Sequence, residues 1–332
     1  MSASNEHHKE AGVALVTVLM IVASMSIVAV MISSAVLAST NRAKSLDASA
    51  QADWFVAGAD QFAALAIEDL VATSGARLFD GMPGLSQAMN FDLEGGVISI
   101  TGTDATNCFN VNRLRDAGRA AAGDASDGAT SVRDDFEMLL DLAGLEGLNP
   151  EAMTSAVIDW MDPDQSPGLG GAEDSYYAGL PLPYRTSGQP LASLSELRAI
   201  RYFEPDLIDS LDPLLCAQPS EESQVFNINT LTEREAPLLS LAMSGALTVE
   251  AARDVLFQRP PGGWESVSAM MELPELAQIS PELRRADMLS VEASHIGVRT
   301  VIEYRGLRRI YDVLFSIEEN GSVTAIRRER KG

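Results

Sequence analysis

The amino-acid sequence predicts an α+β fold in which one very long N-terminal helix packs on an antiparallel sheet and a large all-α region is inserted between strands. Three observations predict this fold. An uncharged run, Ala11–Thr40, is followed by apolar residues at helical spacing up to about residue 71. Strand-like alternation occurs at 91–102 and again at 292–329, whereas the pattern of residues 110–285 between them is helical.

The N-terminal run is long enough to cross a membrane. About 20 apolar residues span the hydrocarbon core as a helix, whereas the apolar region of a signal peptide has only about 7–15. Gly12 stands at the border between a polar lead and the apolar run. A peptidase that cuts after Gly12 would remove the lead and leave the apolar helix in place. The pattern predicts one helix from Val13 to Val71, about 90 Å long, whose first half lies in lipid.

Strands are predicted on both sides of the helical region. The stretches "FDLEGGVISITG" (91–102) and "NCFNVN" (107–112) are interpreted as short strands joined by a turn at Asp104–Asn107. The C-terminal stretch contains two turn signals, Arg305-Gly306 and Asn320-Gly321, which predict three antiparallel strands.

The helical region between them contains a repeat. "FNVNRL" at Phe109 recurs as "FNINTL" at Phe226. Each copy is followed by two predicted helices around a Gly turn and then by a closing segment, "PLASLSELRAI" or "GWESVSAMMEL", in which Ser is a natural N-cap. Helix–turn–helix units of this kind also resemble helix-hairpin-helix proteins that grip DNA, but the Gly-x-Gly hairpin and basic flanks of those proteins do not occur here.

The charge balance indicates which partners are excluded. The chain of 332 residues carries 24 Lys and Arg against 47 Asp and Glu, a net charge of −23. Nucleic acid is therefore not an expected partner, because phosphate binding depends on clustered positive charge. Residues 134–184 contain 11 acidic residues and no Lys or Arg. Such a segment is either a solvated acidic face or a place that holds a hard cation.

Enzyme classes are disfavoured because the residues they need are missing. Behind Gly12 the only histidine is His295, and no G-x-S-x-G or phosphate-binding Gly loop occurs. The two cysteines, Cys108 and Cys216, cannot make a structural zinc site alone. In an exported domain they would form one disulfide, worth about 4–5 kcal/mol for a loop of just over 100 residues. The alternative is two buried thiols. Because each cysteine precedes one copy of the repeat, we expect the bridge to tie the two helical units at equivalent points.

One constellation indicates metal binding, the loop "DWMDPDQSPGLGGAEDSYY". Counted from Asp162, oxygen-bearing side chains occur at positions 1, 3, 5 and 12, which is the spacing of a calcium loop. Pro167 stands where an EF-hand needs Gly, so the loop is not an EF-hand. The candidate ligands are Asp159, Asp162, Asp164, Glu173 and Asp174. Crowded carboxylates favour a divalent ion, and we expect the loop glycines to turn backbone carbonyls inward. An exposed acidic loop is the alternative.

These segments together resemble a known family. The junction "KEAG/VALVTVLMIVASMS", the loop ending in "GGAEDSYY", the closing segment "PLASLSELR" and "FNINT" are similar to the K-type minor pseudopilin of bacterial type II secretion. The resemblance covers nearly the whole chain in the right order. It implies a pilin-like fold with a prepilin leader (1–12), a transmembrane and filament-core helix (13–75), a pilin-like α/β domain (76–108 and 288–332) and an inserted helical domain (109–287).

The resemblance also implies a function. Prepilin peptidase would cut between Gly12 and Val13, and the new N-terminus would be methylated. The chain would be anchored in the inner membrane with its globular part in the periplasm. It would act at the pseudopilus tip with the I- and J-type minor pseudopilins and the major pseudopilin, initiating or capping the pseudopilus. Calcium binding in the insert is a feature of the family. The alternative is a minor pilin of another type IV pilus-like machine, for adhesion or DNA uptake.

Thr17 supports the resemblance. Most pilins carry Glu at this fifth mature position, where it pairs with the N-terminus of a neighbouring subunit, and the K-type lacks it. A carboxylate in the bilayer costs several kcal/mol unless it is paired. A subunit at the growing end has no neighbour ahead to pair with, whereas a threonine hydroxyl bonds back to a helix carbonyl.

Overall fold

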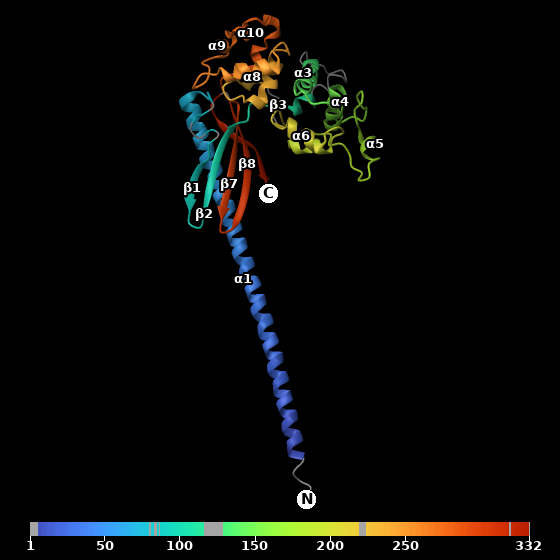
Figure 1. Ribbon diagram of the computed structural model, residues 1–332, viewed down its shortest axis with the longest axis vertical. Helices are drawn as coiled ribbons and strands as arrows, with labels where there is room; N and C mark the ends of the chain where they lie inside the picture. Colours follow the sequence, from blue (N-terminus) through green and yellow to red (C-terminus); the bar gives the residue numbers. More distant parts are fainter. Residues whose placement is uncertain are drawn as a thin grey trace.

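The computed structural model describes residues 6–79, 81–82, 85, 87–115, 129–218, 224–318 and 320–331. A single long helix runs up through the molecule, the sheet lies along its C-terminal part, and the helical insert lies at the end far from the N-terminus (Figure 1). The predicted α+β class is confirmed.

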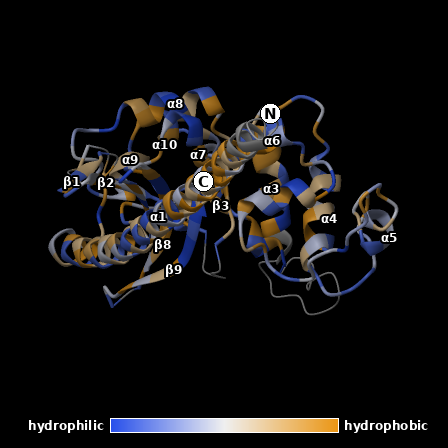
Figure 2. Ribbon diagram, turned by 90° about the horizontal axis from the view of Figure 1, so that it is seen from below, coloured by the Kyte–Doolittle hydropathy of each residue, from blue (hydrophilic) through white to orange (hydrophobic). Residues whose placement is uncertain are grey.

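Helix α1 spans Glu6–Ser74 and thus extends beyond the predicted Val13–Val71 at both ends, further at the N-terminal end. Residues 14–47 are exposed throughout, and the most apolar 18-residue window has a mean hydropathy of 2.7. Seen from below, orange dominates this helix (Figure 2). From residue 48 onward one stripe is buried against the sheet: Ala48, Ala52, Val56, Ala59, Ala63 and Ile67. Because most of these side chains are small, helix and sheet approach closely. The helix ends at Gly75, whose φ of 64° is left-handed.

Five antiparallel strands form the sheet, in the order β1-β2-β7-β8-β9. Their bounds are Met89–Leu93, Gly96–Asp104, His295–Tyr304, Leu307–Ile317 and Val323–Lys331. Alternate side chains face α1, and the rings of Phe55 and Tyr304 meet edge-on with centroids 5.3 Å apart. Polar contacts also join α1 to the sheet: Asp53 accepts from the Tyr311 hydroxyl at 3.0 Å, and Asp60 pairs with Arg328 at 2.9 Å.

The prediction for the first strands was wrong in two respects. The stretch 91–102 contains a hairpin, with β1 and β2 joined at Glu94-Gly95, and Gly95 has a φ of 93°. The stretch 107–112 is not part of the main sheet. Its strand β3, Phe109–Asn110, pairs in parallel with β4, Leu215–Cys216. The three C-terminal strands β7, β8 and β9 lie where the sequence predicts them.

The helical insert leaves the sheet after β2 and returns at β7. Its two ends meet, because the Ala105 amide donates to the His295 carbonyl at 3.0 Å. The first unit comprises β3, η1 (Val111–Arg113), α3 (Ala129–Leu142), α4 (Pro150–Met161), α5 (Asp174–Tyr177), η3 (Leu194–Ala199), α6 (Pro205–Leu211) and β4. The second comprises β5 (Phe226–Asn227), η4 (Glu233–Glu235), α7 (Ala236–Ala242), α8 (Val249–Phe257), α9 (Val267–Met271), α10 (Pro274–Ala277), η5 (Pro281–Leu283), η6 (Ala286–Met288) and β6 (Leu289–Ser290).

Both units contain the same two local features, an asparagine that bonds a distant backbone segment and a short parallel strand pair. The second asparagine of each repeat clamps the backbone at the second residue of the closing segment. Asn112 bonds the N–H and C=O of Leu191 (2.7 and 2.9 Å), and Asn229 bonds those of Trp264 (2.7 and 2.9 Å). Each unit also closes through a two-residue parallel strand pair, β3 with β4 and β5 with β6. The two units share one apolar core, which is separate from the core between α1 and the sheet.

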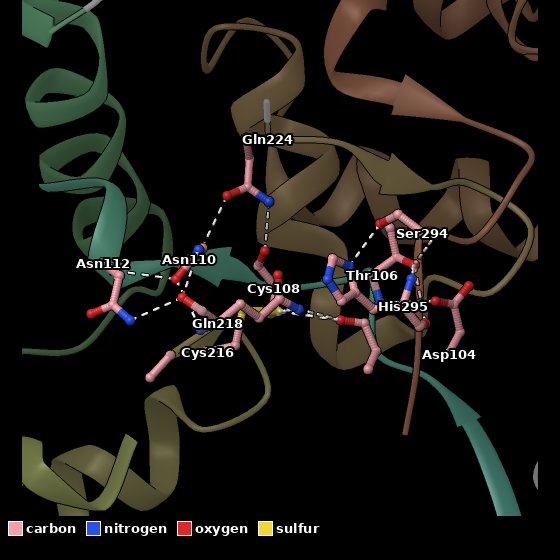
Figure 3. The surroundings of a disulfide bond; sticks show 12 residues. Asp104, Thr106, Cys108, Asn110, Asn112, Cys216, Gln218, Gln224, Ser294 and His295 are labelled. Carbon is pink, nitrogen blue, oxygen red and sulfur yellow. Dashed lines mark hydrogen bonds between the residues drawn. A yellow bond between two sulfur atoms is a disulfide. The ribbon is translucent and has the colours of Figure 1, made fainter. Parts of the chain in front are cut away.

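The disulfide joins Cys108 to Cys216, with the Cα atoms 5.6 Å apart (Figure 3). Cys216 belongs to β4, the last strand of the first unit, so the bridge closes that unit on itself. The expectation that it would tie the two units at equivalent points was wrong. In the second unit Ser290 stands opposite Asn227 as Cys216 stands opposite Asn110.

Candidate metal centre

The acidic loop begins at the end of α4. This helix starts at an Asn149 cap followed by Pro150, and its last turns are buried among apolar side chains of the insert. Asp159 lies in the last turn and is 2% exposed. Asp162 is the C-cap residue, at the point where the chain turns into the loop.

Three carboxylates converge at this point. Asp159, Asp162 and Glu173 each offer an oxygen, and these oxygens lie within 4.8 Å of one another. All three residues are buried. Glu173 comes from the far end of the loop, just before the short helix α5. The loop therefore folds back so that its end meets its beginning.

Hydrogen bonds satisfy two of these carboxylates only in part. Both oxygens of Asp159 accept from the Gly168 amide, at 3.0 and 3.2 Å, and Asp162 accepts from the Asp164 amide at 3.1 Å. The two oxygens of Glu173 are buried, and no donor in the described part of the chain reaches them. A buried carboxylate without a donor is costly, so this position calls for a cation or a proton.

Burial and mutual repulsion raise the pKa of each carboxyl. Burial first, and then the neighbouring carboxylates, raise the pKa of Glu173 to about 8. Burial and the charge of Asp164 raise the pKa of Asp162 to about 6. Burial also raises the pKa of Asp159, against the lowering effect of the amides that donate to it. Without a cation the cluster therefore holds protons near neutral pH.

The other two predicted ligands lie outside the cluster. Asp164 is exposed, and its carboxylate accepts from the Ser166 amide at 2.7 Å. Asp174 accepts from the amide and hydroxyl of Thr186 at 2.9 and 3.1 Å. The structure thus brings together three of the five candidate carboxylates, Asp159, Asp162 and Glu173.

Two glycines let the loop approach the cluster closely. A Cβ on Gly171 would lie 1.9 Å from Oδ2 of Asp159, and one on Gly168 would lie 3.0 Å from Cβ of Ser155. Sequence reasoning attributed a different role to the glycines, that of turning carbonyls inward. In the structure the Gly170 carbonyl accepts from the Tyr202 hydroxyl at 2.8 Å, and the Gly171 carbonyl accepts from Arg201 at 3.2 Å.

Arg201 and Tyr202 were missed by the sequence analysis. They lie about 30 residues beyond the loop, and no local spacing connects them to it. The Arg201 guanidinium also stacks over the rings of Tyr176 and Tyr202, at 4.6 and 4.7 Å from the centroids. Tyr202 has a φ of 77°, which is strained for a residue with a side chain. These two residues hold the outer side of the loop in place.

The donor set fits a hard divalent cation. All converging ligand atoms are carboxylate oxygens, with no sulfur or imidazole among them. Calcium takes six to eight oxygens in flexible geometry, and three carboxylates supply up to six. A bound cation would give the Glu173 oxygens a partner and neutralise the crowded charge.

The remaining predicted site residues lie in α1. The backbone at Gly12 and Val13 is helical. The Thr17 hydroxyl donates to the Ala14 carbonyl at 2.9 Å, the back-bond expected in place of a carboxylate.

Comparisons with known proteins agree on one family. Two family models described as "Type II secretion system (T2SS), protein K" match residues 107–220 and 226–292, which correspond to the two helical units. A "Type II secretion system protein K" of Pectobacterium carotovorum subsp. carotovorum is 34% identical over 269 residues, 80% of each chain. One of Aeromonas hydrophila is 29% identical over 327 residues, 98% of each chain.

A solved structure agrees as well. A chain of the crystal structure of the GspK-GspI-GspJ complex from the enterotoxigenic Escherichia coli type 2 secretion system is similar with a TM-score of 0.74 and 26% identity. The match covers 88% of this chain and 99% of that one. The predicted pilin-like fold is thereby confirmed. The chain belongs to the protein K family of the type II secretion system.

Proposed function

We propose that this chain is a membrane-anchored minor pseudopilin that joins I- and J-type minor pseudopilins at the tip of the type II secretion pseudopilus. One observation carries the proposal. The chain is similar over 88% of its length to a chain of a GspK-GspI-GspJ complex, so the elements that meet partners in that assembly have counterparts here. The family assignment favours this function over a minor pilin for adhesion or DNA uptake.

The N-terminal half of α1 supports the anchoring. Residues 14–47 are all exposed, and the hydropathy of the apolar run among them suits a bilayer. Cleavage between Gly12 and Val13, methylation of Val13, and a periplasmic globular part belong to the same proposal. The helix would be a membrane anchor first and a filament-core helix after assembly.

The insert supports the terminal position. It lies at the end of the molecule opposite the N-terminus, over the end of the sheet (Figure 1). A further subunit stacked above would have to occupy this space. Thr17 fits the same position, because its hydroxyl is satisfied within its own helix and needs no subunit ahead.

Calcium is proposed to hold the acidic loop of the insert. Asp159, Asp162 and Glu173 would bind it, and Gly168 and Gly171 leave room for the loop to close around the site. The ion would supply positive charge where three buried carboxylates meet. Its role would be structural. The ion would hold the inner side of the loop, whereas Arg201 and Tyr202 hold the outer side.

Co-purification tests the proposed function. The part from about Asn41 onward is co-expressed with candidate I- and J-type partners, and the complex is isolated by size-exclusion chromatography. We expect one stable assembly that contains all three chains. If the part from Asn41 is folded but elutes alone with every partner offered, the tip complex is wrong for this chain.

A further inference from the structure

We propose that this chain binds the headgroup phosphate of an anionic phospholipid in a hollow between α1 and the β7–β8 turn, where the helix leaves the membrane. The hollow is lined by Asn41, Lys44 and Ser45 from α1 and by the turn residues 305–307. The inference requires that α1 cross a membrane, and it does not depend on which proteins the chain assembles with.

The position of the hollow follows from the sequence of α1. Asn41, Lys44, Ser45 and Ala48 are three or four residues apart, so they lie on one face of the helix. Ala48 begins the stripe that is buried by the sheet. On the N-terminal side of Ala48 the same helix face is polar. Of the sheet, the β7–β8 turn alone reaches this part of the face. The turn ends at this level of the helix, as Figure 1 also shows.

The hollow presents hydrogen-bond donors. Its polar side chains are an amide, an ammonium, a hydroxyl and the guanidinium of Arg305, and no carboxylate is among its lining residues. Asp47 lies beside it and pairs with Arg305 at 3.3 Å, which leaves further guanidinium N–H groups to donate. Glu94 and Glu303 also lie at this end, and Glu303 pairs with Arg308 at 3.4 Å. Such a set of donors fits a phosphate.

The basic residues near the hollow contrast with the rest of the protein. Among the described residues neither Arg42 nor Lys44 forms an ion pair, and Arg309 follows Arg308 in the adjoining strand. The whole chain has a net charge of −23. Positive charge therefore gathers at the membrane end of a strongly acidic molecule.

The distance along α1 matches the headgroup layer. Leu37 is the last large apolar side chain before Asn41, and Lys44 lies about 10 Å further along the helix at 1.5 Å per residue. The headgroup region of a leaflet is about 5–8 Å thick, and a lysine side chain reaches back toward it. Lys44 and Arg305 are thus within a Debye length of the lipid phosphates, about 8 Å at physiological salt.

Hydrogen exchange of the full chain tests the proposal. The chain is inserted into nanodiscs of phosphatidylcholine alone or of phosphatidylcholine with phosphatidylglycerol, and insertion is verified in both. We expect slower exchange at residues 41–48 and 303–309 in the anionic discs. Each basic residue near an anionic surface strengthens binding about fivefold, so Lys44→Gln and Arg305→Gln should each weaken the protection by about that factor. Arg253→Gln, an exposed arginine in the insert, is the matched control and should change nothing.

Three outcomes would overturn the proposal. Equal exchange in the two kinds of disc would mean that no headgroup is recognised. Equal protection by soluble glycerol phosphate in phosphatidylcholine discs would assign the hollow to a free phosphate. Protection that arises only when I- and J-type partners are added would make it a protein interface. Thermal melts of the variants check that the fold is retained, and both side chains are exposed enough for this to be expected.

Discussion

Glu173 is the residue on which the metal proposal depends most. Both its oxygens are buried and without a donor in the described part, beside two other carboxylates. A cation that binds only the folded state stabilises it by about 2.7 kcal/mol at a hundredfold excess over its dissociation constant. Magnesium should substitute poorly, because it demands a strict octahedron.

The first prediction is that Glu173→Gln lowers the melting temperature in calcium. In chelator the same change should lower the melting temperature less, or raise it. The amide removes one ligand charge but also removes repulsion in the metal-free protein. Asp174→Asn is the control, since Asp174 bonds Thr186 outside the cluster and its calcium response should stay near that of the unchanged protein. Identical melting curves in calcium, magnesium and chelator would show that the loop binds no metal ion and is an ordinary acidic surface.

The second prediction concerns pH without metal. Because burial and repulsion raise the pKa of Glu173 to about 8 and that of Asp162 to about 6, the folded state holds protons that the unfolded chain has released. Stability from these protons is complete below the ordinary carboxyl pKa and is lost as pH rises toward about 8. In chelator the melting temperature should therefore fall between about pH 5 and pH 8, and the gain from calcium should grow. Glu173→Gln should flatten both trends. A stability that rises over this range would contradict the cluster's electrostatics.

Part of this centre could be predicted from the sequence and part could not. The calcium-loop spacing predicted Asp162 and Glu173 as ligands, and the structure places both in the cluster. The same spacing also suggested Asp164, and closeness in the sequence suggested Asp174, but the Ser166 amide and Thr186 engage them instead. The support from Arg201 and Tyr202 depends on tertiary packing, for which spacing within the loop carries no information.

At the scale of elements, the repeated asparagine clamp is the feature that organises the insert. Asn229 is fully buried and satisfies both backbone groups of Trp264. Gly263, which precedes Trp264, has a φ of 78°, and a Cβ on Gly263 would lie 2.6 Å from Cγ of Asn229. The asparagine, the glycine and the following backbone therefore form one interlocked turn.

The third prediction is that Asn229→Ala destabilises the protein strongly. Two buried backbone groups lose their partner, at a cost of about 1–3 kcal/mol each. Chemical denaturation measures the loss, with Asn90→Ala as the control because Asn90 is exposed on the edge strand β1. Equal, small losses for both variants would show that the clamp contributes little.

The N-terminal helix gives the fourth prediction. Replacing Gly12 by a bulky residue such as Leu should block peptidase cleavage and leave a protein about 12 residues longer, which intact-mass measurement detects. Ser4→Leu adds similar bulk within the lead and should leave processing unchanged. If the unaltered membrane form begins at Met1 when the cognate peptidase is present, the processing proposal is wrong.

The sequence predicted the long helix and the C-terminal strands because their patterns are long and strongly periodic. It misread 91–112 because the turn Glu94-Gly95 is only two residues long and lies within a stretch that alternates on both sides. The short parallel pairs β3 with β4 and β5 with β6 could not be predicted, since such pairs exist only when distant segments meet.

At the scale of the whole molecule, the disulfide gives the fifth prediction. Non-reducing mass spectrometry of protein isolated from the periplasm, where we propose that the globular part lies, should find Cys108 joined to Cys216. Replacing both by Ser should lower the free energy of unfolding by about 2–5 kcal/mol, because the bridge closes the ends of the first unit. Finding both thiols free in exported protein would remove this constraint.

The insertion of the helical units between β2 and β7 has a consequence for the order of folding. These two strands pair along nine residues, yet about 190 residues separate them in the chain. Pairing them before the insert folds would require closing a very long loop, which is slow because the entropy is lost before contacts form. Once the insert has folded, Thr230 bonds Asp104 at 2.7 Å and Ala105 meets His295, so β2 and β7 start side by side. The sheet should therefore form last. The stripe of α1 that the sheet buries, from Ala48 to Ile67, should remain exposed until the helical units are complete.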